Sequence, residues 1–171
     1  KPDGDPMDLQ AIGHGTHVAG IAAGYGVESD GTPYGGPYNA TEDMSTFTIG
    51  PGVAPDAKLY AIRVFGSGLS TGIATQGIEW AMDPNKDGNL SDHLDIINLS
   101  LGSEFGTLSN STVTAVENAS AAGVIVVAAA GNEGDTTFIT ASPAVAPRTI
   151  SAAGSYDSGS RGGDLDLVSP S

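Results

Sequence analysis

A histidine between two glycines is the residue of this sequence best suited to chemistry. His14 lies in the segment Gly13-His14-Gly15-Thr16-His17-Val18-Ala19-Gly20, and only small or apolar residues follow as far as Gly24. This pattern predicts an imidazole in the first turn of a helix whose bare surface lets another backbone approach closely. A base that acts on a bound polypeptide needs such a position. A single histidine is, however, more often a solvated or structural side chain.

Two segments predicted to follow strands carry the other candidate groups. Ser100-Leu101-Gly102 ends the apolar segment 95–100, and Ala130-Gly131-Asn132 ends the apolar run 124–130. Ligands of open parallel sheets gather at the carboxyl ends of the strands. The first loop could pair with an extended peptide as an added strand, and Asn132 offers a side-chain amide. Taken singly, the segment Ser100-Leu101-Gly102 could equally be an ordinary loop that follows a strand. Asn132 could equally be a residue that favours a turn next to glycine.

The segments that contain His14, Ser100 and Asn132 resemble, in sequence and in their order along the chain, those of the subtilisin-like serine proteases (subtilases, peptidase family S8). The likeness covers most of residues 11–155 and includes Gly52-Val53-Ala54-Pro55 with the strand after it, and Ala129 to Gly134. The resemblance implies that His14 is the general base of an Asp/His/Ser triad and that the Asn132 side chain donates to the oxyanion hole. It implies a polypeptide substrate whose cleft and first specificity pocket are lined by Ser100, Leu101, Gly102, Ala129, Ala130 and Gly131.

Two members of the family's triad have no counterpart in these residues. The family's catalytic Asp lies some tens of residues before its histidine, and the acids before His14 lack that setting: Asp3, Asp5 and Asp8. The nucleophile motif Gly-Thr-Ser-Met-Ala does not occur, and neither Ser169 nor Ser171 has its glycine and helix start. We therefore interpret residues 1–171 as a partial peptidase domain that lacks the N-terminal Asp segment and the C-terminal Ser segment. Without a nucleophile no acyl-enzyme forms, so we expect this chain alone to be inactive.

Residues 83–92 form a second group of candidate ligands. Side chains with oxygen atoms occupy alternate positions of this segment, and glycine occupies its sixth position. This spacing is similar to the first half of a calcium-binding loop, with a structural Ca²⁺ as its expected ligand. The twelfth position is Leu94 rather than the Glu of an EF-hand, so Asp92 or Asp95 has to close the site. A polar loop of Asx turns remains the alternative. The candidate ligands are Asp83, Asn85, Asp87, Asn89 and Asp92.

The calcium-like segment precedes Asp-Ile-Ile-Asn-Leu-Ser-Leu-Gly, and this arrangement resembles secreted bacterial subtilases that carry an inserted protease-associated domain. That insert could begin after about residue 155. A zinc hydrolase is disfavoured, because His14 and His17 have no glutamate between them and no third ligand nearby. The competing functional class is a non-catalytic, protease-like module that binds peptide or calcium.

Charge and composition limit the partners. Six basic residues against twenty acidic ones give a net charge of −14, which disfavours nucleic acid and anionic membranes. No cysteine is present, so disulfides are excluded. No apolar run approaches the ~18 residues of a membrane span. The sequence begins at Lys1 without a signal peptide, so we interpret it as a mature or excised piece. The resemblance to secreted subtilases implies an extracellular location.

The elements that must position these groups alternate between strand and helix. We expect a buried helix from Thr16 to about Tyr25, a long irregular loop over 26–52 and a strand over 58–65. A helix capped by Ser70 runs to Ala81, and a second one is capped by Ser109 or Asn110 and ends at Gly123. Further strands are predicted over 95–100, over 124–130 with both faces covered, over 149–153, and from Leu165 to Val168. The order predicts an α/β fold, a partial three-layer subtilisin-like fold whose parallel sheet has helices on both faces.

Overall fold

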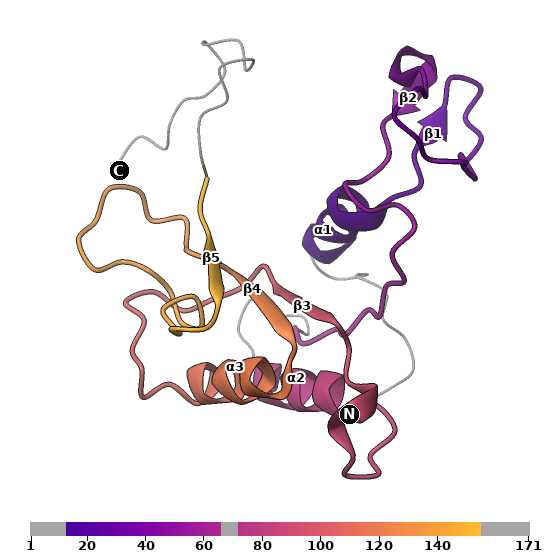
Figure 1. The fold of residues 1–171 in the computed structure, drawn as a ribbon. Coiled ribbons are helices and arrows are strands. Elements are labelled where there is room, and N and C mark those ends of the chain that lie inside the picture. Colours follow the sequence, from indigo (N-terminus) through magenta and orange to yellow (C-terminus); the bar gives the residue numbers. More distant parts are fainter. Residues whose placement is uncertain (1–12, 66–71, 155–171) are drawn as a thin grey trace. The chain divides into compact units, whose positions relative to one another are not determined.

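The computed structural model describes residues 13–65 and 72–154, which fall into two units: residues 1–71 (unit 1) and 72–171 (unit 2). Unit 2 is built on a parallel sheet of three strands in the order β3-β4-β5 (Figure 1). These strands are β3 (Ile96–Leu99), β4 (Ile125–Ala129) and β5 (Ile150–Ala152). Leu99 of β3 is in register with Ala128 of β4, so the two strands end at the same edge of the sheet.

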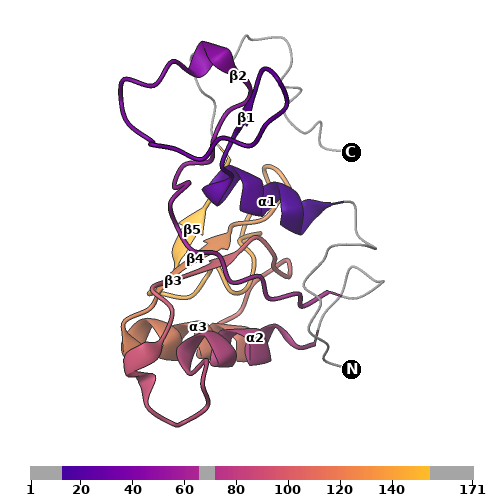
Figure 2. The same ribbon diagram turned by 90° about the vertical axis from the view of Figure 1, so that its right-hand side faces the viewer.

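Helices α2 (Ala74–Met82) and α3 (Ser111–Ala122) lie side by side on one face of this sheet (Figures 1 and 2). Alternate strand residues on that face are buried, among them Leu99 and Val126, and they join the core formed with Ile78 of α2 and Val116 of α3. This alternation follows from the two-residue period of a strand. The residues between them are more exposed, and Ile125 keeps 51% of its surface. The apolar run 124–130 predicted a strand with both faces covered. Within the described residues, β4 is instead buried on one face and more exposed on the other.

Helix α3 begins and ends where the sequence predicted. The side chain of Asn110 accepts a hydrogen bond from the backbone N–H of Thr112 at 2.9 Å, which satisfies one of the free donors of the first turn. The helix ends at Gly123, whose φ of +111° suits glycine. Helix α2 starts at Ala74, whereas the predicted cap, Ser70, lies outside the described residues. A short 3₁₀ helix, η2 (Leu90–Asp92), precedes β3.

Unit 1 contains helix α1 (His14–Ala23), strands β1 (Val27–Glu28) and β2 (Phe47–Ile49), and the 3₁₀ helix η1 (Met44–Thr46). The prediction of an irregular loop over 26–52 is wrong in part, because β1 and β2 pair as a short antiparallel sheet. An aromatic cluster stabilises this arrangement: the rings of Tyr38 and Phe47 both meet that of Tyr34 edge to face, at centroid distances of 5.3 and 5.0 Å. Desolvation in this cluster raises the pKa of the Tyr34 phenol.

Two further predictions for unit 1 need correction. Residues 58–65, which were predicted to form a strand, form neither helix nor strand. Helix α1 is present, but Ala23 is its only buried residue, so its small residues do not make it a core helix. The predicted strand at 165–168, the insert junction near 155 and the N-terminal acids lie outside the described residues.

The predicted fold class is confirmed: helices pack on a parallel sheet in the manner of a partial α/β fold. The strand and helix order of unit 2 follows the predicted alternation. Because β3, β4 and β5 are parallel, the connections from β3 to β4 and from β4 to β5 both leave at the carboxyl ends of the strands. Among the described residues, no helix has the length and apolar character needed to cross a membrane.

Candidate active site

His14 is the first residue of α1 and is exposed. The helix starts after Gly13, which has φ of +77°, and the N–H of His17 donates to the carbonyl of Gly13 at 2.9 Å. A left-handed residue at this point turns the chain sharply into the helix, and glycine adopts that conformation without a steric penalty. The imidazole therefore projects from the first turn of α1, as predicted.

The far end of α1 is held by the Gly52-Val53-Ala54 segment. The carbonyl groups of Ile21, Ala22 and Gly24 accept hydrogen bonds from these three residues at 2.8 to 3.0 Å. This pairing satisfies carbonyls that a helix leaves free at its last turn. A Cβ atom on Gly52 would lie only 2.6 Å from the backbone nitrogen of Gly24, so the contact requires glycine. The conformation of 52–54 thus fixes the helix that carries His14.

In unit 2, the structure brings two of the predicted segments together at one edge of the sheet. Ser100-Leu101-Gly102 leaves β3 where Ala129-Ala130-Gly131 leaves β4. A Cβ atom on Gly102 would lie 3.9 Å from the carbonyl oxygen of Ala129, which places the two exits next to each other. Ser100 and Leu101 are half-buried, and Gly102 is exposed. The arrangement leaves a stretch of backbone at the carboxyl ends of the strands, where ligands of parallel sheets bind.

The loop after β3 is fixed by close packing against residues 140–142. Ser103 and Ser142 exchange backbone hydrogen bonds at 3.0 and 2.9 Å, and Gly106 donates to the carbonyl of Thr140 at 2.9 Å. The buried hydroxyl of Ser142 accepts from the N–H of Thr107 at 3.0 Å. A Cβ atom on Gly106 would lie 2.6 Å from the nitrogen of Ser142, so no other residue fits without movement.

Asn132 lies in the turn after β4 and is exposed. Gly131 before it has φ of +124°, a conformation that L side chains rarely adopt. The N–H of Asn132 donates to the carboxylate of Glu133 at 2.7 Å. Its side-chain carboxamide has no hydrogen-bond partner among the described residues, so both of its N–H groups are available to a ligand.

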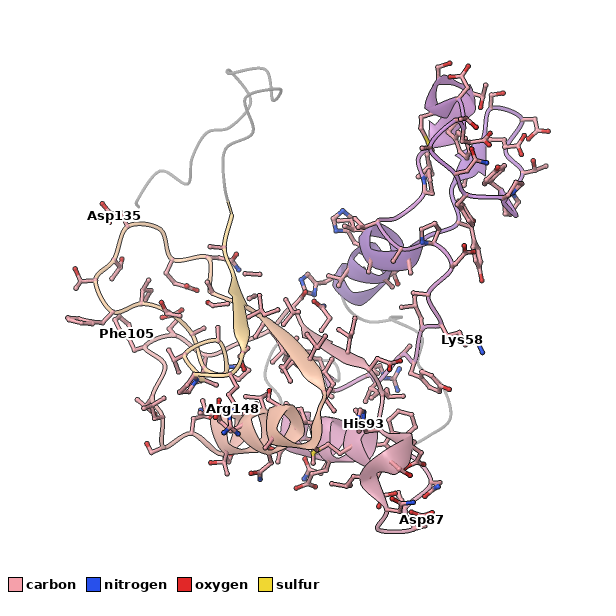
Figure 3. The ribbon with its side chains drawn as sticks, in the orientation of Figure 1. Lys58, Asp87, His93, Phe105, Asp135 and Arg148 are labelled. Carbon is pink, nitrogen blue, oxygen red and sulfur yellow. The ribbon has the colours of Figure 1, made fainter. Side chains whose placement is uncertain are left out.

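The acidic loop after α2 brings three of its carboxylates together. Oxygen atoms of Asp83, Asp87 and Asp92 lie within 4.8 Å of one another, whereas Asp95 is not part of this group. The N–H groups of Asp87 and Gly88 donate to the carboxylate of Asp83 at 3.1 and 3.0 Å, and this folds the loop back on itself. Figure 3 shows Asp87 at the outer end of the loop.

Two residues that support the site were not predicted from the sequence. Glu133 follows Asn132 directly, so an acidic side chain beside the candidate donor was the available signal. Ser142 gave no such signal, because its hydrogen bond to Thr107 joins residues 35 positions apart. His14 belongs to unit 1 and Asn132 to unit 2.

Comparison with known sequences decides the family. The sequence model of the Subtilase family, Peptidase_S8, matches residues 1–165. The chain belongs to the subtilase family. It is 36% identical to Subtilisin E of Bacillus subtilis over 169 residues, which cover 92% of this chain and 36% of that protein. It is 34% identical to Serine protease AprX of the same species over 163 residues, 91% of this chain and 33% of that protein.

A third relative is Subtilisin of Bacillus pumilus, which is 36% identical over 170 residues, 92% of this chain and 50% of the relative. The chain thus spans between a third and a half of the length of these curated relatives. Within this subtilase, His14 begins α1, and Asn132 follows β4 next to the exit of β3.

Proposed function

We propose that this subtilase segment is part of a secreted serine endopeptidase that hydrolyses peptide bonds with an Asp/His/Ser triad. The observation that carries the proposal is the site at the edge of the sheet: an exposed carboxamide, that of Asn132, follows β4 beside the backbone that leaves β3. Membership of the subtilase family and the protease names of the relatives support it. The same resemblance supports an extracellular location.

In this proposal His14 is the general base. Its imidazole takes the proton of a serine hydroxyl as that oxygen attacks the scissile carbonyl, and then gives the proton to the leaving amine. The position of His14 in the first, exposed turn of α1 supports the role, because the ring can reach a bound chain there. The triad Asp and Ser have no counterpart by motif in these 171 residues, so we propose that the segment alone is inactive.

Asn132 is proposed as the side-chain donor of the oxyanion hole. Negative charge develops on the carbonyl oxygen only in the tetrahedral intermediate, so a donor aimed at that position stabilises the transition state more than the substrate. A carboxamide with no partner among the described residues suits this role, since no hydrogen bond has to break first.

The substrate is proposed to be an extended polypeptide that lies along Ser100 to Gly102 and Ala129 to Gly131. Free N–H and C=O groups of an extended backbone recognise an extended peptide by main-chain hydrogen bonds, which do not depend on the side chains of the peptide. This explains how a protease can act on many sequences. Close packing keeps this backbone in place, because a Cβ atom on Gly102 would lie only 2.8 Å from the Cβ atom of Ala141.

Kinetics of the full-length protein test the proposal. His14→Ala should abolish cleavage of a peptide substrate, and Asn132→Ala should lower kcat with little change in KM, because each acts on the transition state. Glu104→Ala, in an exposed position of the neighbouring loop, is the matched control. Unchanged kcat in both site variants would refute the proposal and leave the alternative, a protease-like module that binds peptide without cutting it.

We also propose that the acidic loop binds a structural Ca²⁺. Calcium ligands lie about 2.3–2.6 Å from the ion, so two oxygens on opposite sides of it are separated by about 4.8 Å. The oxygens of Asp83, Asp87 and Asp92 meet this limit, and the side-chain oxygens of Asn85 and Asn89 come from the same loop. Hard oxygen donors and three carboxylates suit Ca²⁺, which would hold the connection between α2 and β3.

A further inference from the structure

The turn that carries Asn132 is firmly anchored on its incoming side. Ala130 donates its N–H to the carbonyl of Ala152 in β5 at 2.8 Å, and its own carbonyl accepts from the N–H of Ala141 at 2.8 Å. Both backbone groups of Ala130 are therefore fixed. Gly131, with φ of +124°, follows at once, so the direction of the chain beyond it depends on contacts made after the turn.

Glu133 supplies such a contact. One oxygen of its carboxylate, Oε2, accepts the N–H of Asn132 at 2.7 Å. The same oxygen occupies the space that a Cβ atom on residue 131 would take, so the carboxylate covers the open side of the glycine. The carbonyl of Glu133 accepts from the hydroxyl of Thr136 at 3.2 Å, which ties the residue to the loop beyond. Glu133 is half-buried, whereas Asn132 is exposed.

We propose that Glu133 is a positioning residue that aims the carboxamide of Asn132, an inference that rests on the proposed peptidase function. A hydrogen bond to the N–H of Asn132 fixes the peptide plane between residues 131 and 132. That plane sets the direction in which the side chain of Asn132 leaves the backbone. Glu133 takes no part in the reaction itself, since its carboxylate contacts backbone and not the side-chain donor. Gly131 thus allows the sharp turn of the backbone, and Glu133 holds the peptide group that follows it in one orientation.

Kinetics of the full-length protein test the inference. We expect Glu133→Ala to lower kcat about tenfold with little change in KM, because a misdirected donor costs less than the ~10²–10³ lost when a donor is removed. Glu133→Gln should restore kcat to within about threefold, since its side-chain oxygen also accepts the N–H. Asp135→Ala removes the same charge from an exposed position of the loop and serves as the control.

A double-variant comparison separates positioning from a general structural effect. In an Asn132→Ala background, Glu133→Ala should have no further effect on kcat, because the residue acts only through Asn132. An equal loss of kcat in that background would overturn the inference. So would a Glu133→Ala variant that changes KM alone, or a Glu133→Gln variant as impaired as Glu133→Ala.

Hydrogen exchange of the Asn132 amide gives a readout that needs no activity. In full-length protein labelled with ¹⁵N-asparagine, the resonance is assigned by its loss in Asn132→Ala. We expect this amide to exchange about fivefold faster in Glu133→Ala than in the wild type or in Glu133→Gln. Equal exchange rates in all three would overturn the inference whatever the activity. A wild type that protects the amide but cleaves no peptide overturns the proposed function, and with it the catalytic purpose of the contact.

Discussion

Ser142→Ala should loosen the loop that follows β3 without touching the proposed catalytic groups. The hydroxyl of Ser142 accepts from the N–H of Thr107 at 3.0 Å and donates to the carbonyl of Thr107 at 3.3 Å. Ser142 is only 3% exposed, so its hydroxyl lies within the packed loop and water has little access to its position. The variant removes both hydrogen bonds from a loop that leads out of the proposed substrate cleft.

The expected loss of stability follows from these two contacts. A hydrogen bond contributes about 0.5–1.5 kcal/mol net, so two contribute about 1–3 kcal/mol. Thr107 is exposed and the second bond is long, so solvent recovers part of this and we expect about 1.5 kcal/mol. For a chain of this size, such a loss lowers Tm by about 3–6 °C.

Urea denaturation and hydrogen exchange by mass spectrometry or NMR measure the effect. Exchange should accelerate at Thr107 and its loop while the amides of α3 keep their protection. Ser103→Ala is the matched control, because Ser103 pairs with Ser142 only through its backbone and is exposed. If the control loses as much stability as Ser142→Ala, or if exchange at Thr107 does not change, the Ser142 hydroxyl does not hold this loop and the reasoning is refuted.

Four other outcomes are expected. Asn132→Ala in the full-length protein should lower kcat by about 10²–10³, the loss that subtilisin shows when its oxyanion-hole asparagine is removed; a loss confined to KM would contradict the proposed oxyanion role. A fluorophosphonate probe should not label the 171-residue chain, and labelling of any serine would show that it contains a working nucleophile. Calcium at about 100 times its Kd should stabilise the chain by about 2.7 kcal/mol, and Asp87→Ala should abolish the rise in Tm; equal melting with a chelator reduces the loop to a turn. Gly52→Ala should destabilise unit 1 by about 1–3 kcal/mol, judged by thermal unfolding, because its Cβ would meet the backbone of Gly24, whereas Gly50→Ala, with open space around it, should not.

Local chemistry explains which features could be predicted from the sequence. The cap at Asn110, the glycine at the end of α3 and the apolar strands β3 and β4 all depend on residues close together in the chain, and each was found at its predicted place. The α/β fold class followed from their order. The grouping of the acidic loop also rests on neighbours in sequence, which explains why its three carboxylates could be named in advance.

The features that could not be predicted depend on contacts between distant residues. Residues 58–65 are rich in apolar residues, but strand propensity depends on the surrounding sheet as much as on the segment itself, so an apolar run does not by itself establish a strand. The pairing of β1 with β2 joins residues about twenty positions apart and depends on the ring of Tyr34 meeting that of Phe47. The tight approach of Gly52 to Gly24 is equally invisible in the sequence, since glycine alone does not identify its neighbour.

Because the loop after β3 is closely packed, the loops at the carboxyl ends of the strands contain some positions that allow no side chain and others that tolerate substitution. Gly102 and Gly106 leave no room for a side chain, whereas Phe105 and Phe138 point away from the protein, the latter with 90% of its surface exposed (Figure 3 labels Phe105). Both phenylalanines have positive φ, at 49° and 60°, so glycine or asparagine would relax the backbone there. A combinatorial library that randomises these two positions should retain folded members and alter peptide preference. A library that also randomises the two glycines should yield mostly misfolded ones.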